Sequence, residues 1–368
     1  MNGDKWKLAL AGLTVGLVAV ALVKLGNPLN MGFCVACFER DIVGALGLHR
    51  TGVVQYMRPE ILGLMLGAFL IALIKGEFHA RGGSSTLVRF FLGMLMMLGA
   101  LVFLGCPLRD VLRISGGDFN ALVGLVGFIA GAFTGTIFLR LGFDLGSAPV
   151  AERQAGGYIM PVFFALLLVL ALAGTVFNPE AGGPLFFSKE GPGSMHAPLL
   201  ISLGAGLLIG IIAQRARLCL SGGFRDFFLI RDTSLLTAYL FIFIGALGLN
   251  LYFGFFKPGF TDQPIAHTMH LWNFLGLFLV GECAVLLGGC PLRQLIMSGE
   301  GDMDAAAVVL GMMAGAATSH NFMFAASAKG VTPYGQAACL AGILIVTLIG
   351  WVYREKITAR AGKTEIAA

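Results

Sequence analysis

Residues 105–109 read Gly-Cys-Pro-Leu-Arg, and the same pentapeptide returns at residues 289–293, a shift of 184. An earlier cysteine motif is duplicated in the same way, with a shift of 185. Its first copy is Cys34, Arg40 and Asp41, and its second copy is Cys219, Arg225 and Asp226. Two motifs that recur with nearly the same shift indicate an internal duplication. We therefore expect two halves built from equivalent elements.

The composition places the chain in a membrane. Of its 368 residues 57% are hydrophobic and only 12% are charged, whereas a soluble domain carries about 25% charged residues. The net charge of +5 is too modest to suggest a nucleic-acid partner. In a membrane protein, positive charge instead sets orientation and contacts lipid. We expect an all-α integral membrane protein.

Ten apolar stretches are long enough, or nearly so, to cross a bilayer of about 30 Å. They cover residues 8–26, 59–75, 88–105, 119–140, 158–177, 197–214, 235–256, 271–289, 304–324 and 334–352. The duplication pairs the first stretch with the sixth, so five crossings separate equivalent elements. An odd number inverts the second half, which predicts two inverted repeats related by an axis in the membrane plane.

Four shorter and more polar segments lie between these stretches, at residues 29–48, 106–117, 215–231 and 290–301. Each begins near a motif cysteine or encloses one. Such segments are candidates for re-entrant half-helices, which are tolerated at membrane depth where they are buried in protein or line a cavity. Glycines spaced along one face, as at residues 124–131 and 204–210, predict close packing between the long helices.

The expected organisation follows from the repeat. Residues 1–157 form the first repeat, closed by a helix at 158–177; residues 178–353 form the second, inverted repeat; and residues 354–368 form a cytoplasmic tail. With both termini inside, 16 of the 25 Lys and Arg residues fall on the inner side and nine on the outer side. This bias favours cytoplasmic termini.

Cys106 and Cys290 each precede a proline at the expected start of a half-helix. Proline suits the first helical position because its missing N–H group would lack a partner there anyway. The cysteines then lie at helix N-termini, which attract anions. The cap residues are Gly105 and Pro107 in one half and Gly289 and Pro291 in the other. The alternative is that both cysteines are small buried apolar residues, which their symmetric recurrence disfavours.

Two arginines, Arg109 and Arg293, follow these cysteines by three residues. An arginine at the bilayer centre costs about 2.5–3.5 kcal/mol, so each needs a partner or a wet cavity. Asp118 and Asp302 recur in register and are the expected partners, which would brace the half-helices. The alternative is that the arginines attract substrate electrostatically. Arg40 and Arg225 each precede an aspartate, a pattern more typical of structural ion pairs.

Three cysteines have no place in the duplicated motifs. Cys37 forms a CxxC motif with Cys34, but position 222 of the second half is glycine. Cys283 lies seven residues before Cys290, and a continuous helix would place both on one face; Cys37 and Cys283 are thus secondary candidates for the pathway. Cys339 is expected to pack against its neighbours. We find no metal, nucleotide or cofactor motif, and we expect no enzyme activity.

The duplicated pentapeptide and the stretch at residues 30–41, Asn-Met-Gly-Phe-Cys-Val-Ala-Cys-Phe-Glu-Arg-Asp, resemble the YeeE/YedE family of sulfur-transport membrane proteins. The second stretch resembles the YedE branch associated with selenium metabolism. The resemblance covers residues 8–350. It implies an hourglass of inverted repeats in the bacterial inner membrane with a narrow, thiol-lined centre. Carried onto this chain, it implies a pathway along Cys34, Cys106, Cys219 and Cys290.

The leading hypothesis is a transporter for a selenium- or sulfur-containing ion. Uptake of thiosulfate is the alternative within the same class. The family resemblance also implies a small cytoplasmic sulfur-carrier protein as partner, besides the ion and membrane lipid. From a different class, a membrane thiol–disulfide oxidoreductase would use Cys34 and Cys37. A structural subunit of a redox complex would leave the duplicated thiols unexplained.

Overall fold

The computed structural model describes residues 3–146, 148–152, 154–173 and 184–354. This part is all-helical, with isolated β-bridges but no β-strand. The long helices are α1 (Gly3–Lys24), α3 (Pro59–Ile74), α4 (Thr86–Phe103), α6 (Phe119–Arg140), α7 (Ile159–Leu172), α8 (Leu199–Ala216), α10 (Ser234–Tyr252), α11 (His270–Leu286), α13 (Met303–Asn321) and α14 (Pro333–Val352). The short helices are α2 (Val35–Ala45), α5 (Pro107–Ser115), α9 (Leu220–Ile230) and α12 (Pro291–Gly299), with 3₁₀ turns at Gln154–Tyr158 and Pro192–Ser194.

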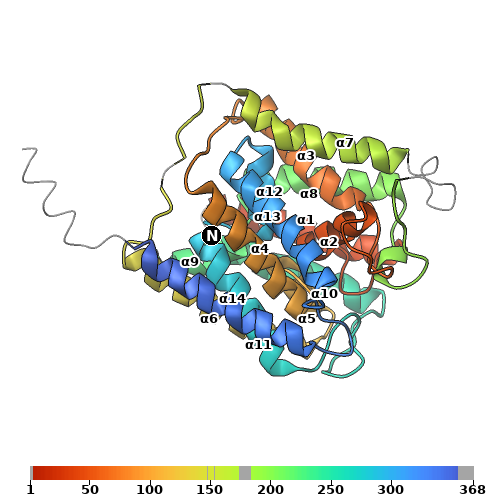
Figure 1. Cartoon of the computed structure of the whole chain (residues 1–368). Helices are drawn as coiled ribbons and strands as arrows, with labels where there is room; N and C mark the ends of the chain where they lie inside the picture. Colours follow the sequence, from red (N-terminus) through yellow and green to blue (C-terminus); the bar gives the residue numbers. More distant parts are fainter. Residues whose placement is uncertain (1–2, 147, 153, 174–183, 355–368) are drawn as a thin grey trace, which may run out of the picture.

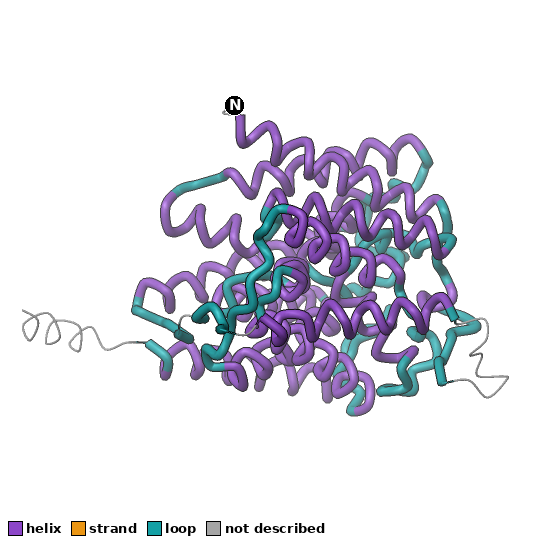
Figure 2. Tube along the Cα trace, turned by 90° about the horizontal axis from the view of Figure 1, so that it is seen from above, coloured by secondary structure: helices purple, strands orange, loops and turns teal. Residues whose placement is uncertain are grey.

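The ten long helices coincide with the ten predicted stretches to within a few residues, and they run roughly side by side (Figures 1 and 2). Within the described residues, eight segments are long and apolar enough to cross a membrane. Helix α3 is apolar but has only 16 residues, and α13 is not among the eight. The prediction of an all-α, multi-pass membrane protein is confirmed. Residues 174–177 of the fifth stretch and 355–368 of the tail lie outside the described residues.

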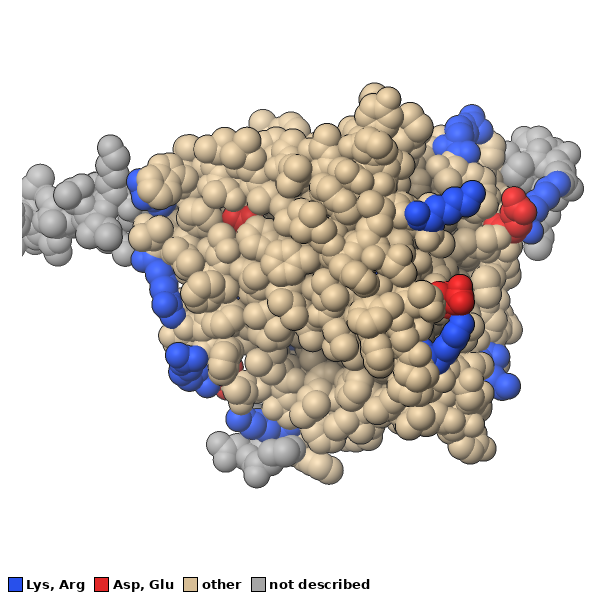
Figure 3. Space-filling view, turned by 90° about the horizontal axis from the view of Figure 1, so that it is seen from below, with Lys and Arg blue, Asp and Glu red and all other residues tan. Residues whose placement is uncertain are grey.

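The surface along the middle of the molecule is apolar, as contact with lipid requires. Helix α14 exposes Leu340, Leu344 and Leu348, which are four residues apart and so share one face. Its opposite face buries small residues such as Cys339 and Gly342. In Figure 3 the charged side chains gather at the two ends of the molecule, with a broad uncharged zone between them. This distribution matches an apolar belt flanked by two aqueous faces.

The two halves exchange helices. Helix α1 packs along α10, and its counterpart α8 packs along α3, the counterpart of α10. In the same way α4 packs along α13 while α11 packs along α6. Each contact is thus repeated with the halves interchanged, as two repeats related by a two-fold axis require. Neither half forms its own bundle.

Glycine sets these close contacts, as the sequence predicted. A methyl group added at Gly127 or Gly131 would lie 2.1 or 2.0 Å from the carbonyl oxygens of Phe274 and Phe278. The same holds for Gly210, where it would lie 2.1 Å from the Leu64 oxygen, but not for Gly204, which faces open space. Backbones that approach this closely tolerate only hydrogen at the contact.

The four short helices occupy the four predicted short segments, and each begins at the residue after its motif cysteine. Leu104 has φ +64°, which ends α4, and Gly288 has φ +75° just after α11. Pro107 and Pro291 then start α5 and α12 at the first helical position. A helix cannot run through these prolines unbroken, because each lacks an N–H group. All residues of α2 and most of α5 are buried.

Candidate functional site

All four duplicated cysteines occupy the same kind of position, the residue that caps a half-helix. Cys34 caps α2, and its Sγ accepts a hydrogen bond from the backbone N–H of Cys37 at 3.4 Å. Cys219 caps α9, and its Sγ accepts one from the N–H of Gly222 at 3.3 Å. Cys106 and Cys290 cap α5 and α12 with extended backbones and make no side-chain capping bond of their own.

The half-helices bring these cysteines together in two pairs. The Sγ atoms of Cys34 and Cys106 lie 3.8 Å apart. In the second half, the backbone N–H of Cys290 faces the Sγ of Cys219 at 3.5 Å, and Ser221 Oγ lies 3.1 Å from the same sulfur. All four side chains are buried and none is in a disulfide. Each pair joins two motifs that are about 72 residues apart in the sequence.

Each pair also lies where two helix N-termini converge. Cys34 and Cys106 cap α2 and α5, and their Sγ atoms are 3.8 Å apart. Cys219 and Cys290 cap α9 and α12, and the N–H of Cys290 lies 3.5 Å from the Sγ of Cys219. Free N–H groups and the helix dipole make such ends favourable for anions. A thiol adds a weak donor and a soft, polarisable acceptor.

The remaining cysteines divide between the site and the packing. Cys37 lies beside the first pair, with Arg109 Nη1 3.6 Å from its Sγ. Cys283 lies near Cys339 of α14 instead. The expectation that Cys283 and Cys290 share a continuous helix is wrong, because α11 ends at Leu286 and the chain turns before Cys290.

The predicted partners of the two motif arginines are also wrong. Asp118 pairs with Arg113, at 2.7 Å from Oδ2 to Nε, and not with Arg109. Arg109 is fully buried and donates to three backbone carbonyls, those of Asn30, Leu104 and Ile265. Carbonyl oxygens near the break between α4 and α5 lack helical partners, so a guanidinium with five donors satisfies several of them at once.

In the second half, Arg293 pairs with Glu300 at 3.1 Å, and Asp302 pairs with Arg81 at 2.9 Å. Both predicted aspartates instead cap the following long helix. Asp118 accepts from the N–H of Asn120, and Asp302 from the N–H of Ala305, each at 2.9 Å. The physical reason is the turn before each long helix, where an aspartate satisfies unpaired N–H groups.

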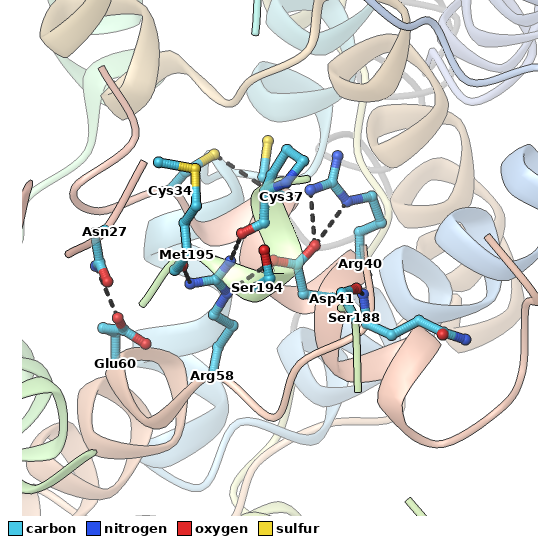
Figure 4. Close-up of polar contacts among 12 residues, drawn as sticks. Asn27, Cys34, Cys37, Arg40, Asp41, Arg58, Glu60, Ser188, Ser194 and Met195 are labelled. Carbon is cyan, nitrogen blue, oxygen red and sulfur yellow. Dashed lines mark hydrogen bonds and ion pairs between the residues drawn. The ribbon is translucent and has the colours of Figure 1, made fainter. Parts of the chain in front are cut away.

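The Arg40–Asp41 pair lies inside a buried network near Cys34 and Cys37 (Figure 4). Asp41 accepts from Arg40 at 2.7 Å and from Arg58 Nε at 2.7 Å. Arg58 also donates to the carbonyls of Pro192 and Met195, at 2.7 and 3.0 Å, and stacks on Phe38. The equivalent Arg225–Asp226 pair is partly exposed, at 32% and 24% for the two side chains.

A cavity of about 1130 Å³ includes Cys219 of the second cysteine pair in its lining. We call it the basic vestibule. Its described lining includes five basic side chains and one acidic one, with Cys219 at its inner end; the charged residues are Lys7, Arg215, Arg217, Arg225, Arg293 and Asp226. At the rim, hydrogen bonds from Gln214 and Arg215 hold the pKa of the Glu77 carboxyl below its usual range.

A smaller cavity of about 450 Å³ shares no described lining residue with the basic vestibule. Its lining includes Arg40, Leu104 and Ile265, and the carbonyls of the last two bind Arg109. Arg109 thus connects the lining of this cavity to Cys37, whose Sγ lies 3.6 Å from its Nη1.

No group of three or more potential metal ligands occurs among the described residues. The sequence reasoning missed three buried side chains at the site: Arg58, Arg113 and Tyr239. None belongs to a duplicated motif. In the sequence they are marked only as polar residues within, or next to, an apolar stretch.

Comparison with known proteins relates part of this chain to sulfur transport. Residues 215–361, which include Cys219 and Cys290, match the family described as sulphur transport. A protein named thiosulfate transporter TsuA from Escherichia coli (strain K12) is 31% identical over 108 residues, 29% of this chain and 30% of the relative. Another protein of that name, from Spirochaeta thermophila, is 34% identical over 119 residues, 32% of this chain and 36% of the relative.

These alignments span about a third of the length of each relative. They are consistent in naming sulfur transport, and neither relative is named for selenium. The resemblance seen in the sequence is thus confirmed at the level of the family: over residues 215–361 this chain matches the sulphur transport family.

Proposed function

We propose that the protein is a transporter that takes up a sulfur-containing oxyanion such as thiosulfate through the two cysteine pairs. The observation that carries this proposal is that four half-helices each begin at a buried cysteine and that these cysteines meet in two pairs. Amide groups suit the oxygens of such an anion, and a thiol suits its soft terminal sulfur. The names of the relatives support thiosulfate over a selenium species, which we keep as a competitor in the assay.

The basic vestibule supports the same proposal. Its net positive lining would concentrate an anion next to Cys219. Weak, successive sites are also what conduction requires, because a site that binds too tightly would retain the ion.

We propose further that the repeats span residues 1–157 and 178–353 and are inverted in a bacterial inner membrane with both termini in the cytoplasm. The basic vestibule would then be the cytoplasmic exit, since it contains Lys7 near the start of α1. A small sulfur-carrier protein would receive the product at this face. The redox alternative is disfavoured, because Cys34 and Cys37 are buried where a partner protein's thiol has no access.

The decisive experiment is uptake of radiolabelled thiosulfate by purified protein in liposomes. Cys106→Ala and Cys290→Ala should each lower uptake by about ten-fold or more, the effect of losing one hydrogen bond to a charged group. Cys339→Ala is the matched control, because Cys339 is equally buried but lies on α14 among packing residues. Unlabelled selenite and sulfate, added as competitors, separate the possible substrates.

Uptake that is normal in both site variants would contradict the pathway. Selenite that abolishes the uptake of labelled thiosulfate at a much lower concentration than unlabelled thiosulfate does would move the preferred substrate to selenium. A loss that Cys339→Ala shares would reflect general damage to the fold.

A further inference from the structure

Tyr239 of α10 is a buried polar side chain with no structural partner. The residue is 4% exposed, and its hydroxyl makes no hydrogen bond with any of the residues that the structure describes. Buried polar groups are nearly always hydrogen-bonded, because leaving one unpaired costs free energy. A hydroxyl kept in this state needs an explanation outside the packing of the fold.

The hydroxyl lies near cysteines of both pairs. It is within electrostatic range of Cys106 from the first pair and of Cys219 and Cys290 from the second. Helix α10 packs against both α5 and α9, which are half-helices from the two different halves.

The equivalent position of the first half shows that the fold does not require a hydroxyl here. Gly12 and Gly16 of α1 meet the carbonyls of Ala238 and Ile242, just as Gly206 and Gly210 of α8 meet those of Glu60 and Leu64. Equivalent residues of α3 and α10 therefore differ by 178, from 238 − 60 and from 242 − 64.

Two backbone hydrogen bonds, one at the start of α6 and one at the start of α13, show the same shift of 178. Phe119 N–H binds the carbonyl of Gly259, and Met303 N–H binds that of Arg81, where 259 − 81 is again 178. By this register Tyr239 corresponds to Ile61, which is apolar and fully buried. The tyrosine is thus a departure from the repeat, located near cysteines of both pairs.

Resting on the transport function proposed above, we infer that Tyr239 contacts the substrate. Its hydroxyl donates a hydrogen bond to an oxygen of the sulfur oxyanion as the anion passes between Cys106 and Cys290. A phenol is a better donor than a thiol, and it is neutral, so it bridges the gap between the pairs without trapping the ion. The Tyr239 hydroxyl, which has no partner in the described part of the fold, is then the donor that the substrate oxygen accepts from.

The test uses Tyr239→Phe, which removes only the hydroxyl, and Tyr252→Phe as its control on the same helix, where the ring is 80% exposed. Both variants and the unmodified protein are placed in liposomes, and influx of radiolabelled sodium thiosulfate is measured. In parallel, thermal unfolding of each protein in detergent is recorded with and without sodium thiosulfate.

We expect Tyr239→Phe to lose about ten-fold of influx, the effect of one hydrogen bond to a charged group, and to lose most of the thiosulfate-induced shift in Tm. Its Tm without substrate should equal or exceed that of the unmodified protein, because no bond of the fold is lost. Tyr252→Phe should match the unmodified protein in both assays.

Influx of Tyr239→Phe within two-fold of the unmodified protein would overturn the inference and leave the transport function standing. A fall in its substrate-free Tm would also overturn it, since the hydroxyl would then be bonded within the fold. If the unmodified protein neither transports nor responds to thiosulfate, the proposed function fails, and the inference with it.

Discussion

The two cysteine pairs come from the same duplicated motif, yet their surroundings differ. Around the first pair the charges are sealed: Arg109 binds backbone carbonyls, and Asp41 is enclosed by Arg40 and Arg58. Around the second pair Arg225 and Arg293 face the basic vestibule. One set of charges braces the structure, and the other is available to an approaching anion. Duplication of a motif therefore does not duplicate its role.

Single amino-acid differences between the two copies of the motif account for the different surroundings of the two cysteine pairs. Arg113, which binds Asp118, corresponds to Met297, and Glu300, which binds Arg293, corresponds to Gly116. Gln294 donates to the carbonyls of Leu287 and Gly289 in the second half, as Arg109 does to Leu104 in the first. Because Gln294 binds the carbonyls at the break between α11 and α12, Arg293 can line the basic vestibule instead.

The largest expected effect comes from the equivalent aspartates. Asp41→Asn leaves two buried arginines uncompensated and should lower the free energy of unfolding by about 3–5 kcal/mol. Asp226→Asn breaks a partly exposed pair and should cost at most about 1 kcal/mol. Denaturant or thermal unfolding of the purified variants measures both. Equal losses would erase the distinction between a sealed and an open half.

A loss of stability of intermediate size is expected at two equivalent glycine contacts, and it tests whether the two halves pack in the same way. Gly16→Ala and Gly210→Ala each place a methyl group against a backbone oxygen, at 2.3 and 2.1 Å. Each should destabilise the protein by about 1–3 kcal/mol through overpacking. Gly204→Ala is the control, because this position faces open space. A large difference in Tm between Gly16→Ala and Gly210→Ala would show that the α1–α10 and α8–α3 contacts are not equivalent.

The smallest effect concerns the rate of substrate entry. Arg293→Gln removes one positive charge from the basic vestibule and should slow thiosulfate flux from that face by about three-fold at low ionic strength. The difference from the unmodified protein should shrink as salt is added, because mobile ions screen exposed charges. Flux at several salt concentrations measures this. A salt-independent loss would indicate instead that Arg293 acts as a brace.

The sequence predicted the ten long helices and four half-helices, because apolar length and proline position are local signals. It placed Cys106 and Cys290 correctly at half-helix starts from their prolines, whereas the capping positions of Cys34 and Cys219 were not predicted. It assigned Asp118 to Arg109 by register, and the true partner, Arg113, was missed because it lacks a counterpart in the second half. Arg58 and Tyr239 were missed because their roles depend on contacts with distant segments. A repeat reveals what two halves share and hides what only one half has.

The exchange of helices between the halves also bears on how the protein is made. Gly12 of α1 rests on Ala238 of α10, a partner synthesised 226 residues later. At about 5–20 residues per second, α1 waits about 10–45 s for this surface. During synthesis its glycine-lined face must lie against lipid or against the insertion machinery. The first half is therefore an unfinished folding unit until the second half emerges, and slowing translation between the two should lengthen its exposure to proteolysis.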